Sequence, residues 1–288
     1  CSSEGKWNFQ ELFKAGKKKI ISFNGSMEIR KGKLTLISRK KDLPLNLSMT
    51  DINGKADLWA NPSFNFSVTG RDGSSCLSLK GEGDYIKSRF SGITEISDID
   101  ISKWGKLVRI KHLNFTEGKI NANLSLSLFP QKNGNLFLNI EGNGNIREGS
   151  VDCFEGKVHV NDIKGNMRFK GDSLTLLDIQ GRRENSFVNV AGKISFLQKD
   201  PFLNILLDCP DFQVHPVINK FFPEVEKFKI KGTVSIKTLI NGPAHKALFL
   251  STITSPSIKV KGKICQNLYA RGSFREKKLH IQEVACLF

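Results

Sequence analysis

Apolar and polar residues alternate along most of this chain, and this alternation constrains the fold more than any other feature of the sequence. Residues 120–128 read I-N-A-N-L-S-L-S-L, with every apolar residue at an even position. Successive side chains of a β-strand point to opposite faces, so this segment has one apolar face and one wet face. Because the same period recurs from end to end, the sequence predicts an all-β protein of antiparallel strands, each with one buried face.

The apolar positions of these strands are predicted to line one elongated groove. They are Phe64, Phe66, Val68, Leu77, Leu79, Ile120, Leu124, Leu126, Leu128, Leu136, Leu138, Ile140, Val188, Val190, Val234 and Ile236. The intervening polar residues, such as Asn123, Ser125 and Asn139, are expected to face water. We expect about 15 to 18 strands. Helix is confined to one or two turns within residues 98–107 and 215–228, too little to cover such a sheet.

Gly and Asn punctuate the alternating runs and indicate where the strands turn. Asn53-Gly54, Asn133-Gly134 and Asn241-Gly242-Pro243 are typical of hairpin turns. Gly81-Glu82-Gly83 and Gly142-Asn143-Gly144 lie among strands, so we interpret them as turns and not as phosphate-binding loops.

The chain also contains an internal repeat. Residues 51–81 and 162–192 align without a gap at a constant offset of 111 residues. Each copy begins with Asp-Ile-x-Gly, continues through Gly-Arg and Ser to an alternating strand, and closes on Gly. Further along, the segment that begins at Asp98 matches the one that begins at Asp211, and a third copy begins at Ile258.

The repeat predicts one continuous elongated domain. Residues 1–23 form a lead-in segment, 24–141 the first groove repeat, 142–255 the second, and 256–288 the start of a third. A unit whose apolar face is uncovered is stabilised by its neighbours, so such an array grows in one dimension. This argues against a closed globule with a single active site. We interpret Cys1 as either a point at which the chain was cropped or a lipidated start.

The net charge of +16 bears on the partners of the chain. Nucleic acid is the usual partner of so basic a protein, but the aromatic-stacking and helix-in-groove motifs that should accompany it are missing, so we expect no nucleic acid. Lys and Arg alternate with apolar residues along the whole chain. Such a flank suits an anionic phospholipid surface, and it equally suits a solvated face that prevents edge-to-edge aggregation.

No catalytic or metal-binding constellation emerges, so we expect a non-enzymatic protein without a cofactor or metal. The five histidines, His112, His159, His215, His245 and His280, show neither HxH nor HExxH spacing. The six cysteines contain no CxxC pair and are expected to be mostly small core residues. Asp98 and Asp100 are expected to cap a turn. Phe221-Phe222-Pro223 is expected to pack over the groove end, or else to touch a membrane or partner.

Two stretches combine Gly, Asp and alternating apolar residues in a recognisable order. Within residues 160–217 the chain reads V-N-D-I-K-G-N-M-R-F-K-G-D-S-L-T-L-L-D-I-Q-G and later V-N-V-A-G-K-I-S-F. Within residues 211–243 it reads D-F-Q-V-H-P-V-I-N-K-F-F-P and then K-I-K-G-T-V-S-I-K-T-L-I-N-G-P. This pattern extends over nearly the whole chain and resembles the TamB and AsmA-like family of bridge-like lipid-transfer proteins, although the chain is unusually basic for this family.

The resemblance implies a taco-shaped β-groove with an apolar interior that carries phospholipid through the periplasm of the cell envelope to the outer membrane. It also implies an inner-membrane anchor in a part of the protein outside this chain and, for TamB itself, an outer-membrane barrel partner. Two other functions stay open. One is an assembly factor that hands strands to an outer-membrane barrel. The other is a secreted β-solenoid with a dry core, although solenoid repeats usually have about 20 to 30 residues.

Overall fold

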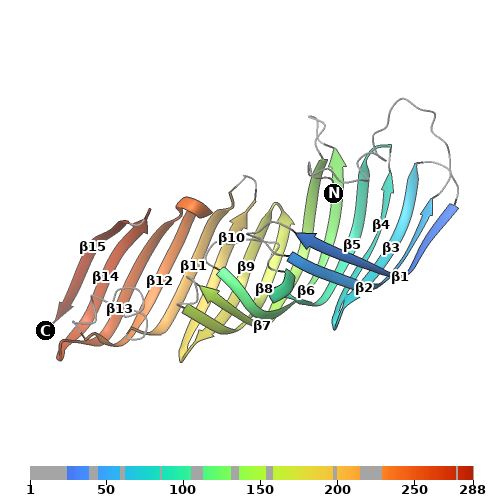
Figure 1. Cartoon of the computed structure of the whole chain (residues 1–288). Coiled ribbons are helices and arrows are strands. Elements are labelled where there is room, and N and C mark those ends of the chain that lie inside the picture. The colour runs from blue at the N-terminus through green and yellow to red at the C-terminus, as the bar shows by residue number, and fades with distance from the viewer. Residues whose placement is uncertain are drawn as a thin grey trace.

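Fifteen β-strands form one antiparallel sheet, and their order in space is their order in the sequence (Figure 1). The computed structural model describes residues 25–38, 45–58, 62–84, 86–104, 113–130, 136–153, 158–196, 200–214, 229–276 and 278–287. The strands are β1 (Gly25–Ser38), β2 (Leu45–Leu58), β3 (Ser63–Asp72), β4 (Ser75–Asp84), β5 (Arg89–Asp100), β6 (Leu113–Pro130), β7 (Leu136–Cys153), β8 (Val158–Gly171), β9 (Ser173–Arg183), β10 (Ser186–Ser195), β11 (Phe202–Gln213), β12 (Lys231–Pro243), β13 (Leu248–Val260), β14 (Lys263–Arg275) and β15 (Lys278–Leu287). The predicted all-β groove is confirmed.

The sheet is long and open, with β1 at one edge and β15 at the other. Fifteen strands at about 4.8 Å spacing give a length of about 65–70 Å. Large apolar side chains of several strands are exposed, among them Met27 at 58%, Leu138 at 50% and Leu279 at 64%. Much of the sheet therefore lacks a covering layer.

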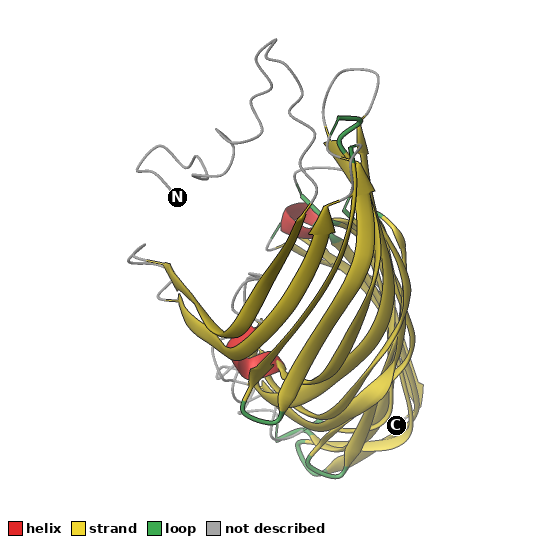
Figure 2. Ribbon diagram, turned by 90° about the vertical axis from the view of Figure 1, so that its right-hand side faces the viewer, coloured by secondary structure: helices red, strands yellow, loops and turns green. Residues whose placement is uncertain are grey.

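A row of β-bulges bends the longer strands. Lys31, Asp51, Asp98, Glu148 and Asp162 have positive φ between 49° and 56°. Each lies at a shift in the pairing register of its strand. Because a bulge kinks a strand and increases its twist, the sheet folds along this row into a trough that is open on one side (Figure 2).

The inside of the bend is the apolar face. A buried cluster joins Val151 of β7, which lies on one side of the bulge row, to Met167 of β8 on the other side, together with Ile101, Ile146 and Ile163. A second cluster of Val214, Val234, Ile258 and Cys265 closes the trough further along the sheet. The core therefore lies in the crease, and the walls rise from it.

The two repeat copies have the same geometry at the crease. Asp51 and Asp162 adopt φ of 49° and 52°, and each lies opposite a glycine, Gly70 or Gly181. A Cβ added to Gly70 would lie 2.6 Å from the Met49 Sδ atom, and one added to Gly181 would lie 2.7 Å from the Val160 Cγ1 atom. Met49 and Val160 each precede the aspartate by two residues. The glycine of each copy is therefore needed because the bulge brings the neighbouring strand so close. The third copy differs at another position, since its Lys261-Gly262 is a hairpin turn where the matching Lys31-Gly32 and Glu148-Gly149 form bulges. The repeat boundaries stay a prediction.

A buried serine supports the next bulge in both copies. The Ser75 hydroxyl is 2.7 Å from the Asp98 carbonyl oxygen to which it donates, and the Ser186 hydroxyl is 2.6 Å from that of Asp211. These serines are 3% and 0% exposed. Their hydroxyls thus satisfy carbonyl groups that the bulges leave out of the strand ladder.

We expect Ser186→Ala to lower the free energy of unfolding by about 1–3 kcal/mol, because the Asp211 carbonyl loses the hydrogen bond from the fully buried Ser186 hydroxyl. The Gln213 amide, which donates to the Ser186 hydroxyl at 3.4 Å, should exchange its hydrogen faster. Denaturant titration and hydrogen exchange measure these changes. Ser125→Ala, at an exposed position, is the control and should stay within about 0.5 kcal/mol of the unsubstituted chain. Equal effects of the two changes would contradict the role of Ser186.

Several predicted turns are wrong. Asn53-Gly54 lies inside β2, Gly81-Glu82-Gly83 inside β4 and Gly142-Asn143-Gly144 inside β7. The chain reverses instead at Gly73-Ser74 and Glu184-Asn185 and at other short connections. Asn and Gly tolerate positive φ and flat, close backbone contacts, and strands with bulges use these properties as turns do.

Asn241-Gly242-Pro243 also differs in detail from its prediction. These residues still pair as the last three of β12, and the 3-10 helix η4 (Ala244–Lys246) then connects β12 to β13. The Asn133-Gly134 turn lies outside the described residues.

Helix is as scarce as predicted among the residues that the structure describes. Within residues 98–107 the structure has the single turn α1 (Ile101–Trp104). Asp100 caps it, because its carboxylate accepts hydrogen bonds from the Ser102 amide at 2.9 Å and hydroxyl at 2.6 Å. Burial alone would raise the pKa of Asp100, but these hydrogen bonds outweigh it and the pKa is lowered. The helical turn predicted within residues 215–228 lies outside the described residues.

Candidate functional site

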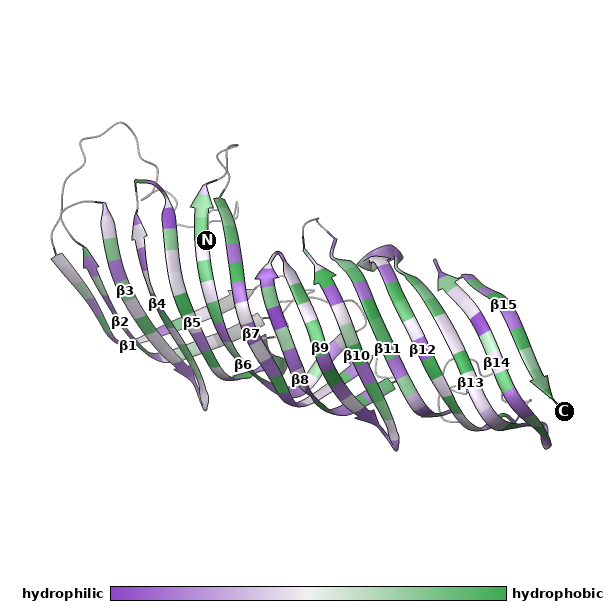
Figure 3. Ribbon diagram, turned by 180° about the vertical axis from the view of Figure 1, so that it is seen from behind, coloured by the Kyte–Doolittle hydropathy of each residue, from purple (hydrophilic) through white to green (hydrophobic). Residues whose placement is uncertain are grey.

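Strand register places all sixteen predicted lining residues on one face of the sheet. One row runs from Phe66 through Gly81 and Gly92 to Leu126 and Ile140 across five neighbouring strands. Cross-strand partners share a face, so the pairings of β8 and β9 place the lining residues of β10 on this same face. The pairings of β11 do the same for the lining residues of β12. Polar and apolar residues alternate along the strands accordingly (Figure 3).

The lining residues remain in part open to solvent. Leu136 is 56% exposed and Leu138 is 50% exposed, whereas Val234, which belongs to the second buried cluster, is 4% exposed. The other lining residues are half-buried. The trough is therefore closed at its crease, and its apolar walls lack a complete protein cover.

Aromatic rings form part of the trough lining near the N-terminal end. The Phe66 ring stacks on the Phe90 ring at a centroid distance of 5.3 Å and lies 6.0 Å from the Phe64 ring. Cross-strand pairing puts these rings opposite the glycines of β4 and β5, where no side chain competes for the space. Our sequence prediction omitted Phe90, which is the sole large apolar residue in its short run R-F-S-G.

Both ends of the sheet extend the apolar face beyond the predicted set. On β1, Met27 and Ile29 lie on the same face as Phe66 and Val68, because both pairs of residues are opposite the same residues of β2. Met27 is 58% exposed and Ile29 is 44% exposed. On β15, Leu279 and Ile281 are 64% and 62% exposed. These residues follow the same alternation of apolar and polar residues, so the sequence pattern could have identified them as lining residues.

Polar groups interrupt this face at a few points. Thr94 is 6% exposed, and the hydroxyls of Thr238 and Ser251 lie 2.9 Å apart. Arg183 is 4% exposed, lies 5.2 Å from the centre of the Phe212 ring, and contacts Glu184 at 3.2 Å. An uninterrupted apolar track, which the alternation alone suggests, is therefore an oversimplification.

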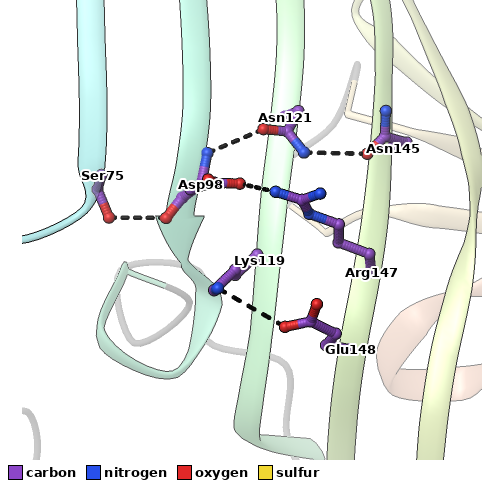
Figure 4. Close-up of polar contacts among 7 residues, drawn as sticks. All are labelled: Ser75, Asp98, Lys119, Asn121, Asn145, Arg147 and Glu148. Atoms are coloured by element: carbon purple, nitrogen blue, oxygen red, sulfur yellow. Dashed lines mark hydrogen bonds and ion pairs between the residues drawn. The ribbon is translucent and has the colours of Figure 1, made fainter.

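A polar network on the other face fastens the bulge of β5 to its neighbours (Figure 4). The Asp98 amide donates to the Asn121 side chain at 2.9 Å, and Asn121 donates to Asn145 at 3.2 Å. Arg147 of β7 forms an ion pair with the Asp98 carboxylate. Asp98 thus does not cap α1, as we had predicted for it, but holds three strands together.

The outer face also carries apolar residues and one hollow. Leu206, Leu239 and Leu250 stand side by side on β11, β12 and β13, and the first two are 47% and 37% exposed. A shallow hollow of about 580 Å³ lies over β3–β6, where Lys80, Glu82 and several serines line it. This hollow is on the opposite side of the sheet from the apolar trough.

Two of the three described histidines lie beside a carboxylate, and the third, His280 on β15, is exposed. His159 Nδ1 is 2.6 Å from an Asp152 carboxylate oxygen, and His245 Nδ1 is 3.3 Å from that of Asp200. Within the described residues, no group of three His, Cys, Asp or Glu could hold a metal ion. His112, His215, Cys1 and Phe221-Phe222-Pro223 lie outside the described residues.

Fold and lining together define an open antiparallel β-groove with an apolar inner face. No family model matches the chain, and neither does any curated protein or solved structure. Neither α1 nor any other helix among the described residues has the length and apolar character of a membrane span.

Proposed function

We propose that this chain is a segment of a lipid-conducting groove, similar to the TamB and AsmA-like proteins, that carries phospholipid between the inner and outer membranes through the periplasm. The observation that supports this most is the uncovered apolar inner face, with side chains such as Leu136 and Leu138 half exposed or more. Each Å² of apolar surface left in water costs about 25 cal/mol. Acyl chains would remove that cost and leave the trough open for movement.

The groove acts passively in this proposal. Acyl tails lie along the half-buried Leu, Ile, Val and Phe side chains, and the headgroups stay at the open side of the trough. The crease is sealed by the two buried clusters, so the tails contact the walls above it. Because the apolar contacts are non-directional, a lipid can slide from one strand to the next without a large barrier.

We expect phospholipid to co-purify with this chain and mass spectrometry to detect it after mild extraction. Apolar contact drives the binding, so the lipids should share long acyl chains and show little selectivity for headgroup. A sample mixed with vesicles and re-isolated should exchange its lipid for the vesicle lipid. A chain that stays free of lipid after this exposure would contradict the conduit.

The second candidate is an assembly factor for outer-membrane β-barrel proteins, and the open edges of the sheet favour it. Among the strands that the structure describes, β1 with fourteen residues and β15 with ten each pair on one side only. Such edges can template an added strand. A photo-crosslinker distinguishes the two functions in the full-length protein. Placed at Leu126, it should capture lipid for the conduit, whereas at Lys278 it should capture nascent barrel strands for the alternative.

A further inference from the structure

The edge strand β15 has few side-chain contacts with the rest of the molecule. Nine of its ten residues are exposed, and Cys286 is the exception. Its apolar residues Leu279, Ile281 and Val284 are all more than 60% exposed. Apart from the backbone ladder to β14, Cys286 is therefore the main attachment of this strand.

Cys286 is in contact with a second cysteine. Cys265 on the neighbouring strand β14 is 2% exposed and belongs to the second buried cluster, against which Cys286 packs. The Cys286 thiol interacts with the Cys265 thiol and raises its pKa. Gln266 pairs with Leu287, so the two cysteines lie on a cross-strand diagonal beside a bulge, on the same face. A regular cross-strand diagonal separates Cα atoms by about 7–8 Å, at the upper limit for a disulfide, but here Cys286 packs against the cluster of Cys265 and interacts with its thiol.

The other described cysteines lack a comparable neighbour. Cys76, Cys153 and Cys209 lie on β4, β7 and β11, which are not adjacent strands. A disulfide needs Cα atoms within about 7 Å, and two intervening strands at about 4.8 Å each exceed that distance. Cys265 and Cys286 are thus the described pair whose positions suit a bond.

We propose that Cys265 and Cys286 form a reversible disulfide that fixes β15 to β14. The oxidant is a small-molecule or protein disulfide. The Cys286 thiolate attacks it, forms a mixed disulfide and releases one thiol; the Cys265 thiolate then attacks the Cys286 sulfur and releases the second thiol. Two protein thiols are oxidised and the oxidant's disulfide is reduced to two thiols, so atoms and electrons balance.

The order of these steps follows from the surroundings of the two thiols. Cys286 is half-buried, so it reaches an oxidant in solution, whereas Cys265 does not. The hydrogen bond with Cys286, together with burial, raises the pKa of Cys265 to about 11. Since the thiolate is the attacking species, ring closure should accelerate as the pH rises toward that value.

The test treats the whole chain with oxidised glutathione, blocks the remaining thiols, and digests the protein with trypsin. The cleavage sites give two peptides, Ile264–Arg271 and Leu279–Phe288, with one cysteine each. We expect these peptides to appear joined, at a mass about 2 Da below their sum because two hydrogens are lost. Hydrogen exchange of the β15 amides should slow by about tenfold or more in the oxidised chain.

Cys286→Ser should abolish the joined peptide and the slower exchange, whereas Cys76→Ser should leave both unchanged. The oxidised unsubstituted chain provides the result even if a variant folds poorly. Recovery of both peptides as separate glutathione adducts in the folded chain would overturn the proposal. So would a joined peptide that forms without any change in β15 exchange, since the bond would then not fix the strand.

Discussion

Under the proposed conduit function, Leu126→Asp is expected to abolish lipid transfer while the sheet stays folded. Leu126 lies in the row between Gly92 and Ile140 on the inner face, so every acyl chain that passes along the trough borders it. An unpaired carboxylate on this wall costs several kcal/mol if it stays dry. Because the position is half-buried, the carboxylate can reach water in the folded chain without lipid. The substitution should therefore disturb the passage of acyl chains more than it lowers the stability of the fold.

The neighbouring residue offers a matched control, because Ser125 is exposed on the opposite face. Ser125→Asp should transfer lipid at the normal rate, and Leu126→Lys should be milder than Leu126→Asp because the longer side chain can snorkel toward the open side. Transfer of a fluorescent phospholipid between donor and acceptor vesicles measures the effect. Normal transfer by Leu126→Asp combined with loss in Ser125→Asp would favour the edge-handing function instead.

Gly192→Ala is expected to lower the stability of the sheet strongly. Gly192 has φ of +144°, and a Cβ there would lie 2.2 Å from the Asn204 carbonyl oxygen and 2.7 Å from the Ile205 Cα. The obstacle is backbone of the next strand, which can move only if the β10–β11 pairing opens. We expect a loss of at least about 3 kcal/mol. Because elongated repeats unfold in parts, hydrogen exchange in β10 and β11 is the most direct measurement.

Two other glycines test the cause of this effect. Gly73 also has positive φ, at +61°, but nothing lies within 4 Å of its added Cβ; Gly73→Ala should therefore cost about 1 kcal/mol, from backbone strain alone. Gly81 is the repeat equivalent of Gly192, with a Cβ 2.3 Å from the Ser91 carbonyl oxygen. Gly81→Ala should reproduce the large loss in β4 and β5. Similar small losses at Gly73 and Gly192 would show that the neighbouring strands yield easily.

The repeat glycines show how a sequence pattern can be correct while its structural interpretation is wrong. Gly81 was recognised as the closing glycine of a repeat copy, yet Gly81-Glu82-Gly83 was assigned to a turn. The same error affected Asn53-Gly54, which sits beside the bulge at Asp51. Gly and Asn identify places where a side chain or a negative φ is not tolerated. They do not say whether the chain reverses there or continues as a kinked strand.

Faces and burial were predicted with unequal success for a related reason. The alternation assigned Leu124, Leu126, Leu138 and Ile140 to one side, because the face of a strand residue depends only on its parity. How deeply a residue is buried depends on the bend, which brings Val151 and Met167 together from opposite sides of the bulge row. Arg183 illustrates the limit, since its charge indicates exposure and the crease nevertheless buries it to 4%.

Period-2 alternation was enough to predict an antiparallel sheet with one apolar face that forms a groove, because strand geometry converts the alternation directly into two faces. Where the creases of the groove lie, how deeply each residue is buried and which cysteines meet became visible only in the folded chain. Those properties depend on contacts between strands. A glycine such as Gly70, which lets Met49 approach across the bulge at Asp51, gains its meaning only when the neighbouring strand is in place.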